Sequence, residues 1–89
     1  MRRDGPLWLR FRAGEGPEPP RVAYAVGRKV GPAPVRNRLR RRLRAAVDEM
    51  AGELSAGASY LFGAEAAAVR LSPDELRAAV RRLVSGAPR

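Results

Sequence analysis

The sequence of 89 residues contains neither cysteine nor histidine. Without these side chains the chain cannot form a disulfide, a thiolate or imidazole metal site, or a nucleophile activated by histidine. Most familiar protein-catalysed chemistry is therefore excluded, and a function based on binding is favoured. A chain this short buries only about 60% of its unfolded surface, so residues 1–89 are expected to form one small domain.

Long apolar runs are absent as well. No stretch approaches the roughly 20 apolar residues needed to cross a bilayer. The basic residues Arg2 and Arg3 are followed by Asp4 and Gly5, not by the apolar segment of a signal peptide. We therefore expect a cytoplasmic protein with no membrane partner.

Acidic residues are missing from one continuous stretch. Between Pro19 and Val47 the sequence has nine basic residues and no Asp or Glu, while the rest of the chain balances nine basic residues against nine acidic ones. The formal net charge of +9 therefore comes from this stretch alone. A local excess of this kind indicates a polyanionic partner.

The first part of the chain predicts two strands. Residues 7–12 and residues 21–27 each alternate apolar with other side chains, as half-buried strands do. The segment between them, residues 13–20, is rich in Gly and Pro and predicts a loop. We expect the two strands to form a loose hairpin.

A long helix is predicted next. Prolines at positions 32 and 34 hold the residues before them in an extended conformation, so the helix is expected to begin at or just after Pro34. From Val35 to Leu54, apolar residues recur at spacings of three and four and form one stripe about five turns long. Gly57 ends this region, and residues 58–62 are short and mostly apolar, as a buried strand would be.

Several helix-start signals agree at Ser72. Its side chain can cap the amide of Glu75, the Glu75 side chain can return to the Ser72 amide, and the proline after Ser72 fits the first helical position. A last helix is predicted over residues 73–85, ended by Gly86 and Pro88. The order strand, strand, long helix, strand, helix contains a segment of βαβ length and predicts an α+β fold with helices against a small sheet.

The long helix carries an unusual density of arginine. Six of the nine residues from 36 to 44 are arginine. The residues opposite the apolar stripe are Asn37, Arg40, Arg41 and Arg44, and those beside it are Arg36, Arg38 and Arg42. The guanidinium group suits bidentate phosphate contacts and stacking on bases, so nucleic acid is the expected ligand. The alternatives are a solvated surface, which the lack of acids disfavours, and a membrane-surface helix, whose apolar stripe the protein core also requires.

The same region contains a recognisable motif. Its residues are Arg28, Lys29, Val30, Gly31, Ala33, Arg36, Asn37, Arg38, Leu39, Arg40, Arg41 and Arg44. In this order and spacing they resemble the protein component of bacterial ribonuclease P, in which an Arg-Asn-Arg motif opens a helix behind a Val-rich strand. The resemblance extends over residues 7–84.

The resemblance implies both a fold and a function. The fold is a small αβ sandwich of the ribonuclease P protein type, shared with the second domain of a small-subunit ribosomal protein, with a left-handed βαβ crossover. The function is that of a protein subunit that binds a catalytic RNA and assists removal of the 5′ leader from precursor tRNA. The RNA of that holoenzyme holds the Mg²⁺ ions and does the chemistry, so we expect no catalytic residue, metal ligand or cofactor in this chain.

The resemblance also assigns site residues. Those expected to contact the RNA subunit are Arg28, Lys29, Arg36, Asn37, Arg38, Arg40, Arg41 and Arg44. The family normally has a further N-terminal helix that forms a leader-binding cleft with the sheet. The sequence has no such helix before Leu7, so we expect an N-terminally truncated variant or a start at an internal methionine. Trp8 is the candidate contact with the leader.

Three other functions are considered. A ribosomal or other structural RNA-binding protein would share the charge and size but not the spacing from Lys-Val-Gly to Arg-Asn-Arg. A DNA-binding helix would need a dimer seam or a helix-turn-helix signal, and the sequence has neither. A stand-alone nuclease would need carboxylates as metal ligands. The candidates for such ligands are Asp48, Glu49 and Glu53, or Asp74 and Glu75.

Overall fold

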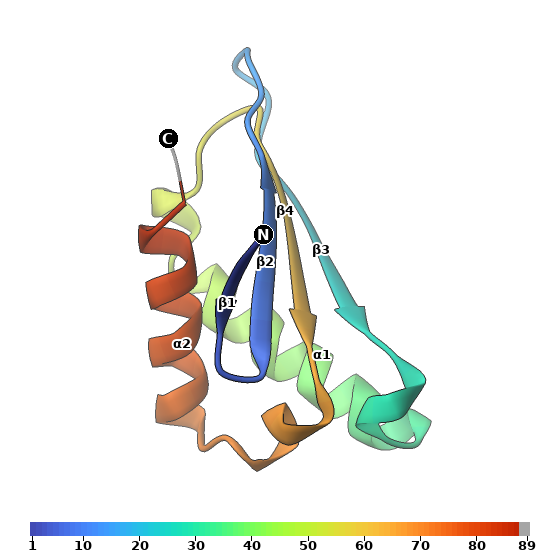
Figure 1. Ribbon diagram of the computed structural model, residues 1–89. Coiled ribbons are helices and arrows are strands. Elements are labelled where there is room, and N and C mark those ends of the chain that lie inside the picture. Colours follow the sequence, from blue (N-terminus) through green and yellow to red (C-terminus); the bar gives the residue numbers. More distant parts are fainter. Residues whose placement is uncertain (88–89) are drawn as a thin grey trace.

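The computed structural model describes residues 1–87 and has a helical layer packed against one face of a four-stranded sheet (Figure 1). The strands are β1 (Arg2–Asp4), β2 (Leu7–Arg12), β3 (Arg21–Val26) and β4 (Ser59–Ala64). The helices are α1 (Ala33–Asp48) and α2 (Pro73–Ser85). Three short 3-10 helices, η1 (Arg28–Val30), η2 (Ala51–Glu53) and η3 (Ala66–Arg70), follow β3, α1 and β4. No helix among residues 1–87 is long and apolar enough to span a membrane.

The strand order of the sheet is β1-β2-β4-β3. β4 pairs antiparallel with β2 and parallel with β3. The expected hairpin of residues 7–12 and 21–27 is therefore wrong, because β4 lies between these two strands. The loop of residues 13–20 is long enough to cross the roughly 10 Å that two strand spacings occupy. β4 is the most buried of the four strands, and it is hydrogen-bonded to β2 on one side and to β3 on the other.

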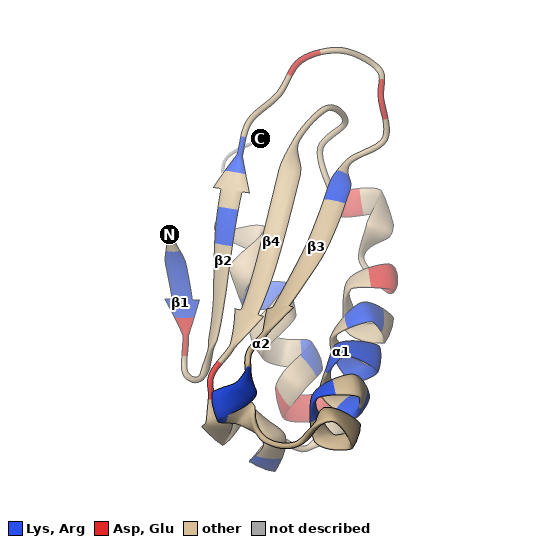
Figure 2. Cartoon of the chain, turned by 90° about the vertical axis from the view of Figure 1, so that its right-hand side faces the viewer, with Lys and Arg blue, Asp and Glu red and all other residues tan. Residues whose placement is uncertain are grey.

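The connection from β3 through α1 to β4 joins neighbouring parallel strands. In Figure 2 both strands run downward, β4 lies to the left of β3, and the helical layer lies behind the sheet. A crossover with this geometry is left-handed, which is the rare hand for such units. The αβ sandwich with a left-handed βαβ unit is thus confirmed.

β1 is a strand that the sequence pattern did not predict. Three residues are too few to show alternation, and β1 is recognisable only through its hairpin with β2. The two-residue loop of that hairpin begins at Gly5, whose φ is 57°. A positive φ at the first loop residue is what a type II′ turn requires, so Gly5 is the signal that could have revealed β1.

The bounds of α1 differ from the prediction at both ends. The helix begins at Ala33 with Pro32 as its N-cap, because a proline in the first turn, here Pro34, lacks only an N–H that has no helical partner. It ends at Asp48, so the expected five-turn helix to Leu54 is wrong. The apolar residues beyond that point, Met50 and Leu54, flank η2 and still pack against the core.

The observed bounds of β4 and α2 agree more closely with their predicted bounds. β4 begins at Ser59 and runs to Ala64, two residues beyond the expected strand of residues 58–62. The range predicted for α2 is confirmed, and so is its capping box, in which the Ser72 and Glu75 side chains each accept a hydrogen bond from the other residue's backbone N–H. Gly86 is its C-cap, while Pro88 lies outside the described residues.

One hydrophobic core fills the space between the sheet and the helices. The largest fully buried side chains are Phe62, Leu7, Leu9, Leu39, Leu43, Leu76, Leu83, Val47 and Val80. The alternate strand positions, which include Trp8, Arg10 and Leu61, face the other way. Within residues 1–87 no helix covers this outer face of the sheet (Figure 2).

The two faces of the sheet should respond differently to the same substitution. Leu9 is fully buried under the helices, so Leu9→Ala should lower the free energy of unfolding by about 2–5 kcal/mol through lost burial and the cavity left behind. Leu61→Ala, on the outer face, should cost under about 1 kcal/mol. Urea denaturation followed by circular dichroism measures both. Equal losses would mean that the outer face is also a core.

An ion pair between Asp4 and Arg82 links β1 to α2. The Asp4 carboxylate accepts hydrogen bonds from Arg82 Nε at 2.7 Å and Nη2 at 2.9 Å. These bonds and the positive charge hold the pKa of Asp4 below its ordinary value, against a smaller opposing effect of burial. A carboxyl group with a lowered folded-state pKa adds stability above its unfolded pKa and loses it as the pH falls through the folded pKa.

The Asp4–Arg82 pair therefore predicts a pH dependence. In Asp4→Asn the free energy of unfolding should fall less steeply than in the wild type as the pH drops below about 4. Urea denaturation between about pH 2.5 and 5 measures the slope. Glu15→Gln, in the exposed loop after β2, is the control and should keep the wild-type slope. An unchanged slope in Asp4→Asn would show that the pair does not stabilise the fold.

Candidate nucleic-acid interface

The exposed surface of α1 follows from what the helix buries. Leu39 and Leu43 are almost fully buried, as the apolar stripe predicts, and the residues of α1 opposite them turn outward. Asn37, Arg38, Arg41 and Arg44 are exposed, and Arg36, Arg40 and Arg42 are partly buried. Figure 2 shows the basic residues gathered along α1 and on η1, at one end of the molecule.

The cations of α1 and η1 have no acidic partner within residues 1–87. The ion pairs of this part of the chain are Arg3–Glu65, Arg77–Glu49, Arg77–Asp74, Arg81–Glu53 and Arg82–Asp4. Every arginine in these pairs belongs to β1 or α2. Like charges four residues apart on a helix repel each other, so α1 has an electrostatic cost that a bound polyanion would remove.

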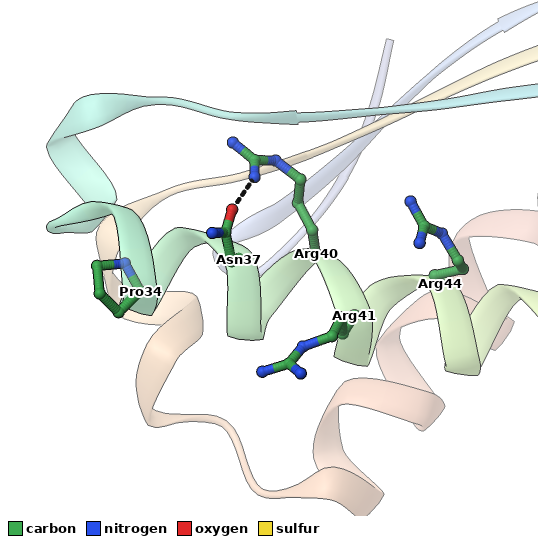
Figure 3. Close-up of a pocket in the computed structure, with 5 residues that line it drawn as sticks. All are labelled: Pro34, Asn37, Arg40, Arg41 and Arg44. Carbon is green, nitrogen blue, oxygen red and sulfur yellow. Dashed lines mark hydrogen bonds between the residues drawn. The ribbon is translucent and has the colours of Figure 1, made fainter.

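Four of the predicted contact residues lie together. Asn37, Arg40, Arg41 and Arg44, with Pro34, line an open groove of about 590 Å³ (Figure 3). The Asn37 Oδ1 atom accepts a hydrogen bond from Arg40 Nη1 at 2.5 Å, which fixes the direction of that guanidinium group. Arg40 and Arg44 extend to one side of the helix and Arg41 to the other. The groove therefore presents guanidinium groups on two sides, and guanidinium groups form strong, often bidentate hydrogen bonds with phosphate oxygens.

Arg44 is positioned by an aromatic ring. Its Cζ atom lies 5.8 Å from the centroid of the Tyr24 ring, within the range of a cation–π contact. Tyr24 stacks in turn on Phe62, with ring centroids 6.1 Å apart. Burial and the nearby Asp48 carboxylate raise the pKa of Tyr24 above its ordinary value, although Arg44 opposes this. The ring is a neutral phenol that holds Arg44 without cancelling its charge.

Two arginines of α1 are directed toward the protein. Arg42 Nη2 donates a hydrogen bond to the Leu71 carbonyl oxygen at 2.5 Å, and so joins α1 to the turn before α2. Arg36 is partly buried, and its Nε is a buried donor without a hydrogen-bond partner in the described part of the chain. Arg42 thus stabilises the fold, and Arg36 offers less of its surface to a ligand than Arg41 does.

The other predicted residues lie at the edges of this surface or away from it. Arg28 and Lys29 are exposed on η1, which packs beside α1 and extends the cationic area past the helix start. Trp8 lies on the outer face of the sheet, apart from the α1 groove. Its ring covers Gly63 so closely that a Cβ on that glycine would come within 1.9 Å of the indole.

The acidic residues do not form a metal site. Glu49 and Glu53 are paired with arginines of α2, and Glu75 is used in the capping box. Among residues 1–87 no three acidic side chains gather closely enough to hold an ion. The carboxylates therefore do not fit the Mg²⁺ ligands that a stand-alone nuclease would need.

Comparison with known proteins identifies the family. A family model described as Ribonuclease P matches residues 2–87. The chain belongs to the Ribonuclease P family. It is 43% identical to the ribonuclease P protein component of Thermobifida fusca over 71% of its own length and 43% of that protein. It is 42% identical to that of Xanthomonas campestris over 88% of its length and 51% of that protein. The chain thus spans about half the length of these relatives.

Solved structures share the fold of this Ribonuclease P family chain. The RNase P protein of Thermotoga maritima, in complex with 1-(4-fluorophenyl)-2-thiourea, superposes with a TM-score of 0.84 at 21% identity, over 97% of this chain and 83% of that one. The RNase P protein of Staphylococcus aureus gives a TM-score of 0.81 at 14% identity, over 93% and 75% of the two chains. At these identities the likeness establishes the fold alone.

Sequence reasoning missed two arginines near Trp8. Arg10 has its Cζ atom 5.8 Å from the Trp8 ring centroid. Arg3 is the cross-strand partner of Trp8 on β1. Alternation along residues 7–12 places Arg10 on the same face as Trp8, but Arg10 was not among the predicted site residues. Arg3 could not be placed, because β1 was not predicted.

Neighbouring arginines of α1 should have separable roles. Arg42→Ala removes the hydrogen bond to Leu71 and should lower the free energy of unfolding by about 1 kcal/mol. Arg41→Ala, an exposed position on the same helix, should leave stability within about 0.5 kcal/mol of the wild type. Thermal and urea denaturation measure both variants. If the two substitutions cost the same, Arg42 has no structural role.

Proposed function

We propose that this chain is the protein subunit of ribonuclease P, which binds the catalytic RNA subunit through the exposed face of α1 and assists removal of the 5′ leader from precursor tRNA. The observation that carries the proposal is the lack of acidic partners for the cations of α1 and η1 within residues 1–87. Unpaired guanidinium groups around one groove match the phosphates of a folded RNA. The names of the relatives support ribonuclease P RNA as that partner.

In this proposal the RNA subunit catalyses the cleavage and the protein assists it. We assign the Mg²⁺ ions that the reaction needs to the RNA, an assignment supported by the lack of a group of three acidic side chains among residues 1–87. The protein contributes positive charge where two polyanions, the RNA subunit and the precursor tRNA, must approach each other. Screening of their repulsion should lower the Mg²⁺ concentration that cleavage requires.

The outer face of the sheet is the proposed contact for the leader. Trp8 is partly exposed there, and Arg10 lies beside its ring. An aromatic side chain next to an arginine suits the stacking of an unpaired base, which contributes about 1–3 kcal/mol. Trp8→Ala should therefore weaken binding of precursor tRNA that has a leader more than binding of mature tRNA.

Reconstitution tests the main proposal. The purified chain is combined with its cognate RNA subunit, and cleavage of precursor tRNA is followed as the Mg²⁺ concentration is varied. The chain should lower the Mg²⁺ concentration needed for half-maximal cleavage. The proposal fails if the chain leaves this concentration unchanged. Cleavage by the protein without RNA, abolished by Asp48→Asn, would support the nuclease hypothesis instead.

The α1 groove should dominate binding to the RNA subunit. If about six phosphates are neutralised, log K should fall with log salt concentration with a slope of roughly −4 to −5. Arg41→Ala and Arg44→Ala should each weaken binding and make the slope less steep by about 0.7 to 0.9. Arg81→Ala, which removes an exposed but ion-paired arginine of α2, is the matched control. An equal effect in Arg81→Ala would mean that net charge alone determines binding.

A further inference from the structure

A second cavity lies where the two parallel strands end. β3 and β4 stop at Val26 and Ala64, and the chain continues into η1 and η3, which contact each other. The residues that line the cavity are Gly27, Arg28, Lys29, Val30, Ala64, Glu65 and Ala66, and its volume is about 440 Å³. The carboxyl ends of parallel strands are a common position for ligands in α/β sheets.

Opposite charges stand on the two walls of this cavity. Arg28 and Lys29 come from η1, and Glu65 comes from the start of η3. These groups form no ion pair with each other within residues 1–87. Glu65 instead pairs through Oε1 with Arg3, which does not line the cavity. The carboxylate is therefore paired with a cation outside the cavity lining, while Arg28 and Lys29 remain available to an anion.

Glu65 keeps free acceptor capacity. A carboxylate has about four lone-pair sites, and Arg3 uses one of them, on Oε1. Oε2 has no hydrogen-bond partner among the described residues. The rest of the cavity lining is small or apolar, from Gly27, Val30 and the two alanines. A lining that combines two cations, one carboxylate and apolar surface suits a ligand that has a phosphate, a planar ring and an edge of N–H donors.

We propose that this cavity binds one guanine nucleotide of a single-stranded RNA, with its phosphate at Arg28 and Lys29 and its base edge at Glu65. Guanine presents two adjacent donors, N1–H and the N2 amino group, to the two carboxylate oxygens. Adenine and cytosine present one amino group beside an acceptor nitrogen, and uracil presents one N–H between two carbonyl groups. Each of these bases places an acceptor against the carboxylate.

The position of the cavity connects it to the other RNA-facing surfaces. Trp8 covers Gly63, the residue before Ala64 in the cavity lining. On the other side, η1 packs against α1. A strand that crosses the outer face of the sheet at Trp8 therefore reaches the cavity at the end of β4. This inference rests on the proposed function, because it requires a single-stranded RNA ligand.

Short RNA oligomers test the base preference. Fluorescence anisotropy compares oligouridine of about eight nucleotides with the same oligomer carrying one central guanine, adenine or cytosine. The wild type should bind the guanine oligomer about fivefold or more tightly than oligouridine, as expected of a good bidentate contact to a base edge. Glu65→Gln replaces one acceptor oxygen by a donor and should reduce this preference to within about twofold.

Three further variants separate the parts of the site. Arg28→Ala with Lys29→Ala should weaken all oligomers alike, because phosphate contacts do not depend on the base. Arg3→Ala removes the cation that pairs with the Glu65 carboxylate but leaves the carboxylate itself, so the guanine preference should fall less than in Glu65→Gln. Glu18→Gln removes the same charge from the loop at the opposite end of β3 and should keep the guanine preference. Circular dichroism checks that Glu65→Gln, a change at an exposed side chain, retains the fold.

The outcomes distinguish this inference from the proposed function. Equal affinity for all four oligomers, or a guanine preference that survives Glu65→Gln, overturns the cavity assignment. If the chain still binds the RNA subunit through α1 in that case, the proposed function stands and only the cavity inference fails. If the wild-type chain binds neither the RNA subunit nor any oligomer, both are wrong.

Discussion

Burial of the apolar stripe of α1 against the sheet determines where the charges of this protein lie. Leu39 and Leu43 are almost fully buried in the one core that sheet and helices share. Because the two leucines fix the rotation of the helix, the arginines opposite them, which include Arg41 and Arg44, must face outward. The electrostatic cost of crowding them is tolerated because hydrophobic burial contributes about 1.5–3 kcal/mol for each large side chain.

Two groups of arginines have different physical roles. Arg3 of β1 and the α2 arginines at positions 77, 81 and 82 pair with acids, and the pair of Arg82 with Asp4 connects elements that are distant in the sequence. Those of α1 and η1 lack acidic partners within residues 1–87, and there the charge is available to a ligand. Arg42 is the exception on α1, because its hydrogen bond to Leu71 turns it toward the fold. Counting arginines in α1 therefore overstates the binding surface.

Both helices lie on one face of the sheet and leave the other uncovered within residues 1–87. This arrangement separates two surfaces that a polyanion can reach. The α1 groove offers guanidinium groups to phosphates, whereas the outer face offers Trp8 to unpaired bases. The cavity beside η1 lies between them and combines cations with the Glu65 carboxylate. Under the proposed function, a folded RNA and a single strand have separate places on one small domain.

Features that depend on neighbouring residues follow from the amino-acid sequence alone. The bounds and capping box of α2 and the buried stripe of α1 were predictable, because caps and helical periodicity act over three or four positions. The strand order, β1 and the full length of β4 depend instead on contacts between distant segments. The contacts of Arg42 with Leu71 and of Arg3 with Glu65 are of this kind, because they join residues 29 and 62 positions apart. Such contacts depend on how the sheet orders its strands, and no local pattern records that order.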